Sequence, residues 1–292
     1  MQKDFERTTQ KDVQKVAIIG AAGKMGNRIS SMLKDDPDYE LLYVEAGEQG
    51  EARLRERGVT PTPKERAVRE ADVLILAVPD TLIGTVAREV VPALKPGAMV
   101  MCLDPAAPYA GELPERADIT YFLTHPSHPP IFQDDPDPEA RRDYWGFGKA
   151  KQSIVNALIQ GPEEDYARGE AIASKMFRPI LRSHRCTLEQ MAILEPVLSE
   201  TVALTCVDLM REAMNEAVRR GVPPEAARDF LLGHINVELA IWFGELDWQP
   251  SAGAMLVLEE AKKQVLRPDW KDVFEPEKIK ESVKSIVSGK LS

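Results

Sequence analysis

The sequence contains few cysteines, and their arrangement excludes two common kinds of site. Cys102, Cys186 and Cys206 are the three cysteines among 292 residues, an odd number without the spacing of metal ligands. A disulfide framework and a cysteine-based zinc site are therefore excluded. Each cysteine lies within an apolar run, so we interpret all three as reduced thiols of the core. Reduced thiols indicate the cytoplasm.

Negative charge exceeds positive charge, and long apolar runs are absent from the sequence. The chain has 37 lysines and arginines against 47 aspartates and glutamates, a net charge of -10. Such a surface repels nucleic acid and anionic membranes. A membrane-spanning helix needs about 20 mostly apolar residues in a row, and the sequence has no such run. Residues 1–14 alternate charges and amides, so we expect a flexible extension there and not a signal peptide.

Apolar residues make up 43% of the chain, enough for a sizeable core. Over residues 15–185, short runs rich in Val, Ile and Leu alternate with segments of helical pattern. Nearly continuous apolar runs are typical of strands buried on both faces of a parallel sheet. We therefore predict a Rossmann α/β domain with a doubly wound, mostly parallel sheet. The predicted strands are 16–20, 41–45, 72–79, 98–104, 119–124, 153–160 and 178–183.

Residues 186–292 lack further strand patterns and predict an all-helical domain. Its helices are expected at 197–220, 224–243, 252–266 and 276–288. The second of these carries apolar residues on more than one face. A helix of that kind needs cover on several sides, which favours burial against a partner subunit in a homodimer.

A glycine-rich turn follows the first predicted strand. Gly20, Gly23 and Gly26 give the spacing GxxGxxG between a strand and a helical pattern. Glycines at such a turn allow a pyrophosphate to approach the helix N-terminus closely. Glu45 ends the second predicted strand, where a carboxylate can bind a ribose 2′-hydroxyl and repel a 2′-phosphate, so we predict NAD and not NADP.

The same sheet edge supplies the remaining cofactor candidates. A third predicted strand ends at Pro79 and Asp80. The simpler alternatives are a plain tight turn, a solvated Glu45 and a helix-capping Asp80. The predicted cofactor residues are Gly20, Ala22, Gly23, Lys24, Met25, Gly26, Glu45, Pro79 and Asp80.

Two histidines lie close together after the fifth predicted strand. His125 and His128 fall within THPSHPP, at the start of a proline-rich, acidic stretch over 126–148. Ligands of open α/β sheets bind beyond the carboxyl ends of strands. These imidazoles therefore suit metal ligands, a proton-transfer group, or turn residues bonded to the backbone.

Carboxylates and lysines elsewhere are further candidates. Glu195 has apolar neighbours and precedes Pro196, which interrupts a helical pattern. Glu200 follows five residues later, about 140° around an α-helix, so the two need not share a face. The simpler interpretation of Glu195 is a residue at a helix N-terminus, and that of Glu200 is a surface residue. Lys149, Lys151 and Asp104 lie near strand ends and suit substrate binding or proton transfer, or simple solvation. The catalytic candidates are Lys151, Glu200 and His128.

Taken together, several segments resemble one family, the D-apionate oxidoisomerases of the 6-phosphogluconate dehydrogenase and ketol-acid reductoisomerase-like superfamily. The resemblance spans roughly residues 16–243. Its specific parts are the histidine loop, which carries His125 and His128, and the segment ILEPVLSET. It implies an NAD-dependent enzyme with a helical dimerisation domain that acts on a branched sugar acid. It also implies one divalent metal, zinc or magnesium, bound by His125 and Glu195, with His128 as a further candidate. The segments are VAIIGAAGKMG, VLILAVPDTLIG, LDPAAP, LTHPSHPPIF, AKQSIVNALIQGPEE, ILEPVLSET and MREAMNEAVRRGVPPEAARDFLLGHIN.

The implied reaction converts D-apionate to 3-oxo-isoapionate by hydride transfer to NAD and a metal-assisted acyloin shift. A carbon shift between oxygenated centres needs a cation that binds both oxygens. Two other functions fit the residues. One is a β-hydroxyacid dehydrogenase that uses Lys151 and no metal, and the other is a non-catalytic NAD-sensing protein.

Overall fold

The computed structural model describes residues 13–290, which form two compact units. The first unit comprises the chain up to Ala192 together with the segment from Val283 onward, and the second is Ile193–Ser282. The division expected at 185/186 falls ahead of this boundary, because Met191 still packs in the core of the first unit. Most of the expected 1–14 extension lies outside the described residues, and Gln14 already begins a strand.

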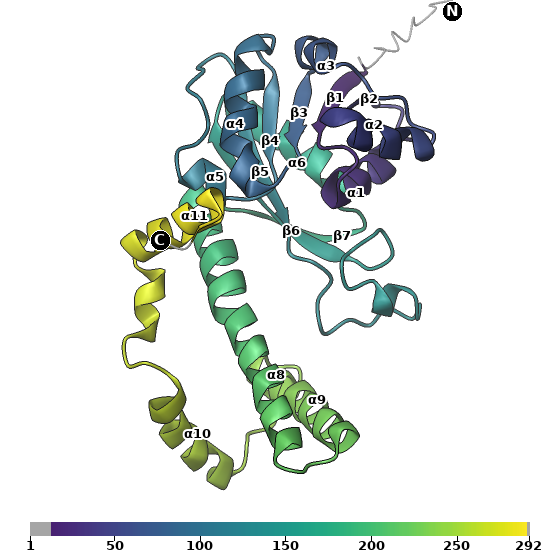
Figure 1. The fold of residues 1–292 in the computed structure, drawn as a ribbon. Helices are drawn as coiled ribbons and strands as arrows, with labels where there is room; N and C mark the ends of the chain where they lie inside the picture. The colour runs from purple at the N-terminus through teal and green to yellow at the C-terminus, as the bar shows by residue number, and fades with distance from the viewer. Residues whose placement is uncertain (1–12, 291–292) are drawn as a thin grey trace, which may run out of the picture. The chain divides into compact units, whose positions relative to one another are not determined.

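The first unit is built on a seven-stranded sheet with the order β2-β1-β3-β4-β5-β6-β7 (Figure 1). The strands β2, β1, β3, β4 and β5 run parallel to one another. Strand β6 is antiparallel to β5, and β7 is parallel to β6. All seven predicted strands are present, which confirms the predicted doubly wound, mostly parallel sheet. The strands are β1 (Gln14–Ile19), β2 (Tyr39–Val44), β3 (Val73–Leu76), β4 (Met99–Cys102), β5 (Thr120–Pro126), β6 (Gln152–Gln160) and β7 (Ile180–Arg185).

Alternate residues of each central strand enter two separate cores. On β1, Val16 and Ile18 pack on the face covered by α1 and α6, whereas Ala17 and Ile19 pack on the face covered by α3 and α4. Every residue of β3 and β4 is buried, as expected for strands covered on both faces. The helices of this unit are α1 (Lys24–Leu33), α2 (Gly47–Glu56), α3 (Lys64–Glu70), α4 (Asp80–Val90), α5 (Ala106–Tyr109), α6 (Glu164–Met176) and α7 (Leu188–Ala192), with short 3-10 turns η1 (Val91–Ala93) and η2 (Ala140–Arg142).

The second unit is entirely helical, as predicted, and few of its side chains are buried. Among the described residues, α8 and α10 have no buried side chain and α9 has only Ala227. Large apolar side chains such as Phe230 and Trp242 are exposed in the single chain. The elements are η3 (Ile193–Ala203), α8 (Leu204–Arg219), α9 (Pro224–Trp242), α10 (Ala252–Val265), η4 (Trp270–Phe274) and most of α11 (Pro276–Ser288).

The helix around Pro196 differs from the sequence-based expectation. Instead of an interruption at this proline, helical structure continues from α7 through η3 into α8, and η3 is a π-helix. Proline lacks the backbone N–H and clashes with the carbonyl one α-helical turn earlier, whereas the wider π-helix bonds five residues apart. The Thr201 hydroxyl also donates to the Pro196 carbonyl over 2.6 Å.

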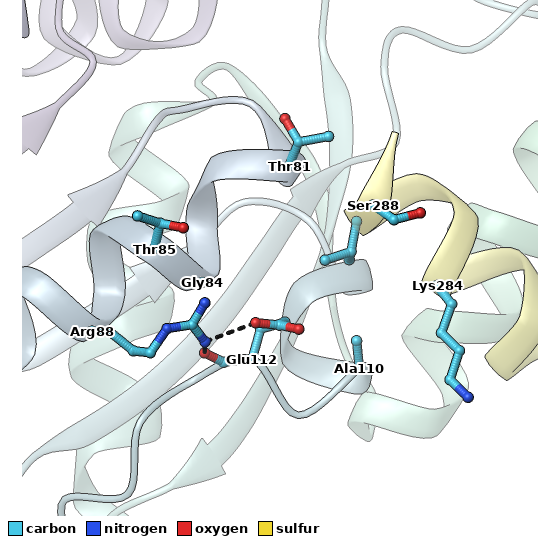
Figure 2. A pocket seen from close by; sticks show the side chains of 9 residues that line it. Thr81, Gly84, Thr85, Arg88, Ala110, Glu112, Lys284 and Ser288 are labelled. Atoms are coloured by element: carbon cyan, nitrogen blue, oxygen red, sulfur yellow. Dashed lines mark hydrogen bonds and ion pairs between the residues drawn. The ribbon is translucent and has the colours of Figure 1, made fainter. Parts of the chain in front are cut away.

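The last turns of α11 return to the first unit beside α4 and α5. There they line a cavity of about 430 Å³ with Thr81, Glu112 and Lys284 at its walls. Figure 2 shows an ion pair between two of the lining residues, in which Arg88 Nη1 lies 2.8 Å from a Glu112 carboxylate oxygen. Val283 is fully buried, which explains why the C-terminal turns belong to this unit.

The three cysteines differ in their burial. Cys102 is buried, Cys186 is half-buried against the same core and Cys206 is exposed, so the prediction of three core thiols is wrong for Cys206. Burial raises the pKa of Cys102 to about 12, which keeps its thiol protonated. None of the described helices combines the length and apolar character needed to cross a bilayer.

Gly169 on α6 packs against Phe122 on β5 without space for a side chain. A methyl group at Gly169 would lie 2.7 Å from Cγ of the fully buried Phe122, which has no room to move. We expect Gly169→Ala to lower the free energy of unfolding by about 1–3 kcal/mol in chemical denaturation. Ala171→Gly, at an exposed site of α6, should cost only about 0.5–1 kcal/mol. A Gly169→Ala protein as stable as the parent would contradict this packing.

Candidate active site

The candidate residues of the first unit gather at one edge of its sheet. Strands β1 to β5 run parallel, so their carboxyl ends meet at the same edge. Because β6 is antiparallel to β5, the long loop between them begins and ends at that edge too. The glycine turn, Glu45, Asp104, both histidines and Lys151 therefore lie along the same edge of the sheet although they are far apart in sequence.

The glycine turn leaves no room for side chains at two of its three glycines. Gly20 has a φ of +85°, and a Cβ at this residue would overlap the carbonyl oxygen of Ala77. A Cβ on Gly26 would lie 2.6 Å from Cα of Ala21. The backbone of the turn can therefore lie directly against β3 and α1, as a dinucleotide-binding turn requires.

Glu45 fixes this turn from the neighbouring strand. One carboxylate oxygen accepts a hydrogen bond from the Ala22 N–H over 2.7 Å, and the other accepts from the Ala46 N–H over 3.1 Å. A Cβ at Gly50 on α2 would overlap the Glu45 side chain. Gly50 therefore helps to place Glu45, a function that no motif in the sequence revealed.

A cavity of about 600 Å³ lies over the carboxyl ends of β1 to β3. Four of the predicted cofactor residues line it, namely Gly20, Gly23, Glu45 and Pro79. Arg53 and Lys64 line the same cavity, and the Lys64 ammonium is paired with Glu89. Of the other predicted cofactor residues, Ala22 bonds Glu45, Gly26 is buried under the turn, Lys24 and Met25 begin α1, and Asp80 begins α4.

Both histidines are held through the same ring nitrogen. Nδ1 of His125 lies 2.7 Å from the Leu103 carbonyl oxygen, and Nδ1 of His128 lies 3.1 Å from that of Trp145. A carbonyl oxygen only accepts, so Nδ1 carries the proton and the neutral ring has its lone pair on Nε2. This arrangement is typical of histidines that bind metals. The ring centres are 6.5 Å apart and nearly perpendicular.

The surroundings of these histidines are partly desolvated. Burial lowers the pKa of His128, which favours its neutral form, and its backbone has a φ of +60°. Burial also raises the pKa of Asp104, whose second carboxylate oxygen lies 4.0 Å from His125 Nδ1. The first oxygen of Asp104 accepts from the Ala106 N–H over 2.8 Å. Asp104 therefore supports the loop that supplies the Leu103 carbonyl to His125.

The long loop is organised around one aspartate that the sequence analysis did not single out. Asp143 accepts hydrogen bonds of 2.7–3.2 Å from four backbone N–H groups, at Gly146, Phe147, Lys149 and Ala150. Burial alone would raise the pKa of Asp143, but these bonds outweigh it and hold the pKa below its usual value. The sequence signal was an aspartate three residues before a glycine, which is common in turns.

The two candidate lysines differ in their surroundings. The Lys149 ammonium lies 2.9 Å from a Glu139 carboxylate oxygen, an ion pair that favours a role in the loop itself. Lys151 is exposed directly before β6, at the sheet edge where it was predicted. Its role in proton transfer stays a prediction.

Glu195 and Glu200 belong to the second unit, where both lie on η3. The 140° separation expected for an α-helix does not apply, because a π-helix bonds residues five apart. Residues five apart therefore lie one turn above each other, and the two carboxylates are on the same side of η3. Within residues 13–290, no three histidine, cysteine, aspartate or glutamate side chains converge as a metal site. The metal role of His125 and Glu195 remains a prediction.

Known proteins resemble this chain over nearly its whole length. A D-apionate oxidoisomerase of Cupriavidus necator is 53% identical over 94% of this chain and 99% of the relative. A D-apionate oxidoisomerase of Rhizobium rhizogenes is 50% identical over 93% and 98%. The chain belongs to the D-apionate oxidoisomerase family. This confirms the resemblance found in the sequence.

Family-level matches and solved structures agree with this assignment. Residues 15–108 match the NAD-binding domain of semialdehyde dehydrogenases, and residues 133–287 match the C-terminal part of decarboxylating phosphogluconate dehydrogenase. A semialdehyde dehydrogenase NAD-binding protein of Cupriavidus necator, crystallised with calcium and NAD, is 52% identical. It superposes with a TM-score of 0.91 over 94% of this chain and 99% of that structure. The chain is an NAD-dependent oxidoreductase with a Rossmann domain.

An archaeal ketol-acid reductoisomerase shares the fold at lower identity. It is 20% identical to this chain, with a TM-score of 0.66 over 94% of this chain and 82% of that structure. This likeness supports the predicted architecture of a Rossmann domain followed by helices.

The contact between Gly50 and Glu45 predicts a change in cofactor selectivity. In Gly50→Ala the new methyl group should displace the Glu45 carboxylate from the Ala22 N–H. We expect NAD affinity to fall about tenfold, equivalent to about 1.4 kcal/mol. The affinity for NADP should fall less or rise, because Arg53 in the same cavity attracts a 2′-phosphate. Calorimetric Kd values for both cofactors measure this ratio.

Gln49→Ala is the matched control, because Gln49 is the exposed neighbour of Gly50 on α2. It should keep both Kd values of the parent protein. An unchanged ratio of NAD to NADP affinity in Gly50→Ala would show that Glu45 does not set the selectivity.

Proposed function

We propose that this protein oxidises and rearranges a branched sugar acid with NAD, converting D-apionate to 3-oxo-isoapionate. The observation that carries the proposal is the pairing of an NAD-type cavity with two oriented histidines at one sheet edge. The relatives at 53% and 50% identity bear the name of this activity. Its free cysteines suit the reducing cytoplasm, which cell fractionation can test.

The nucleotide cavity suits NAD in particular. Glu45 closes the cavity with a carboxylate that can accept bonds from a ribose diol and that repels a 2′-phosphate. Bound NAD supplies the acceptor of the hydride removed from the substrate carbinol. The glycine turn and the start of α1 would hold the pyrophosphate of the cofactor.

The histidine loop suits a divalent cation. The Nδ1 atom of His125 is held by the Leu103 carbonyl, so Nε2 is the ring nitrogen of the type that binds metals. Glu195 is the carboxylate ligand that the resemblance to the family implies. Such mixed nitrogen and oxygen donors fit zinc or magnesium. A bound cation supplies a Lewis acid that polarises adjacent substrate oxygens. His128 is available as a third ligand or as a proton-transfer group.

The three remaining candidates, His128, Lys151 and Glu200, suit proton transfer. Oxidation of a hydroxyl releases a proton, and the rearrangement moves a proton between neighbouring oxygens. His128 is kept neutral by burial and can accept a proton. Lys151 at the same edge can stabilise a developing alkoxide, and Glu200 can exchange protons beside Glu195 on η3.

A second candidate function is a β-hydroxyacid dehydrogenase without rearrangement. The match of residues 133–287 to phosphogluconate dehydrogenase favours it. In that case Lys151 would act as the acid-base group and no metal would be needed. Product analysis after incubation with NAD and chelator separates the two functions, because only the rearrangement needs the cation.

The carboxylate of Glu195 gives a direct test of the metal. Glu195→Gln keeps the shape of the side chain but weakens a ligand, so we expect the affinity for Mg²⁺ or Zn²⁺ to fall in calorimetry. NAD affinity should stay within about twofold, since the nucleotide cavity belongs to the first unit, and turnover of D-apionate should fall by about 100-fold or more.

Glu189→Gln on α7 is the control, because Glu189 is an exposed glutamate one helix earlier. It should retain metal binding and turnover. Full activity of Glu195→Gln, or of protein shown to be metal-free by elemental analysis, would reject the metal and favour Lys151.

We also propose that the second unit forms a homodimer. Its exposed apolar side chains include Leu204, Val207, Phe230, Trp242 and Leu256. Monomeric proteins rarely expose so many large apolar groups in one small region. A second copy of this chain presents the same surface and can cover it.

Light scattering at micromolar concentration tests the dimer. We expect twice the mass of one chain for the parent protein and a monomer for Phe230→Asp. Ile131→Asp places the same charge on an equally exposed apolar residue of the first unit and should leave the dimer intact. A monomeric parent protein would contradict the proposal.

A further inference from the structure

A buried guanidinium lies beneath the histidine loop. Arg28 on α1 is 1% exposed, and its Nη2 donates to the Oε1 atom of Gln152 over 2.9 Å. Its Cζ atom lies 5.1 Å from the centre of the Phe177 ring. Among the described residues, Nε and Nη1 of Arg28 have no hydrogen-bond partner. A buried charge that is only partly satisfied is costly, so its presence needs a reason.

The counter-charge for Arg28 is the aspartate that organises the loop. Burial lowers the pKa of Arg28 to about 10, and the negative charge of Asp143 acts against this decrease. Asp143 in turn gathers the backbone N–H groups of Gly146, Phe147, Lys149 and Ala150. Attraction between opposite charges in a partly buried region is stronger than in water, so Asp143 favours the charged form of Arg28.

The turn passes directly over the side chains of Arg28 and Gln152. A Cβ on Gly146 would lie 2.7 Å from Arg28 Nη2 and 2.6 Å from Gln152 Nε2, which only a glycine allows. Gln152 is fully buried and also donates to the Phe177 carbonyl over 2.8 Å. The position of Gly146 is therefore fixed by α1 from below and by Asp143 from within the turn.

The residue before Gly146 holds His128. The Trp145 carbonyl oxygen lies 3.1 Å from His128 Nδ1, and the Trp145 ring centre lies 4.7 Å from the centre of the imidazole. A shift of Gly146 would move this carbonyl and rotate the imidazole. A continuous set of contacts thus leads from Arg28 through Gln152 and Gly146 to His128.

We propose that Arg28 is a positioning residue, which holds the turn 143–150 against α1 and so orients the His128 ring. The contribution of His128 to turnover rests on the function proposed above, whereas the orientation of the ring does not. Lysine cannot replace arginine here, because the planar guanidinium both bonds Gln152 and stacks on Phe177. Arg28 also lies on the helix that begins at the glycine turn, so one helix supports both the cofactor turn and the histidine loop.

The test compares Arg28→Met with Arg178→Met by amide hydrogen exchange and by NMR of the histidine rings. Arg178 is an exposed arginine that follows α6 and donates to the carbonyl of Met32 on α1 over 2.7 Å. In Arg28→Met we expect exchange at 146–150 to accelerate about tenfold or more, with the α1 and sheet amides unchanged. The His128 ring should lose its single Nδ1–H signal, whereas Arg178→Met should behave as the parent protein.

A double variant separates positioning from general support of the core. Asp143→Asn should accelerate the same amides, and the effect of the double variant should differ from the sum of the two single effects, because both residues act on one turn. Faster exchange throughout α1 and the sheet, or an unchanged turn and His128 signal, would overturn the proposal. If the turn loosens while kcat and KM for D-apionate stay unchanged, the positioning stands and the proposed catalytic use of His128 fails.

Discussion

Close backbone contact at the glycine turn is the constraint on which the rest of the site depends. Because neither Gly20 nor Gly26 has room for a Cβ, β1, β3 and the start of α1 meet without intervening side chains. The cavity over the strand ends follows from this contact, since a bulkier turn would fill the space. The direction of α1 is set at the same point, and α1 in turn carries Arg28 beneath the histidine loop.

Carboxylates bonded to backbone N–H groups recur along this sheet edge. Glu45 holds the glycine turn through Ala22, Asp104 holds the loop after β4 through Ala106, and Asp143 holds the turn after the histidines. Each of these bonds satisfies a polar backbone group and fixes a loop to a rigid strand or helix. The mobile parts of an open sheet edge are thereby held in place before any ligand binds, which reduces the entropy lost on binding.

The π-helix η3 shows how one residue changes the use of its neighbours. Pro196 is incompatible with regular α-helical bonding, and the wider helix places Glu195 and Glu200 on one side. Two acidic residues on one side of a helix can act on a common ligand, whereas on an α-helix they would diverge. π-helical segments are frequent at functional sites.

The sequence by itself determined the seven strands, the helical second half, the glycine turn and the family. These depend on local patterns, because burial on both faces produces continuous apolar runs and tight turns need glycine. Only the tertiary structure decided the positions of Gly50, Arg28 and Asp143, since their partners lie on other elements. It also decided the π-helix at Pro196 and the return of α11 to the first unit. Hydrogen bonds and ion pairs between distant segments leave no periodic trace in a sequence, so these features became visible only when the chain was folded.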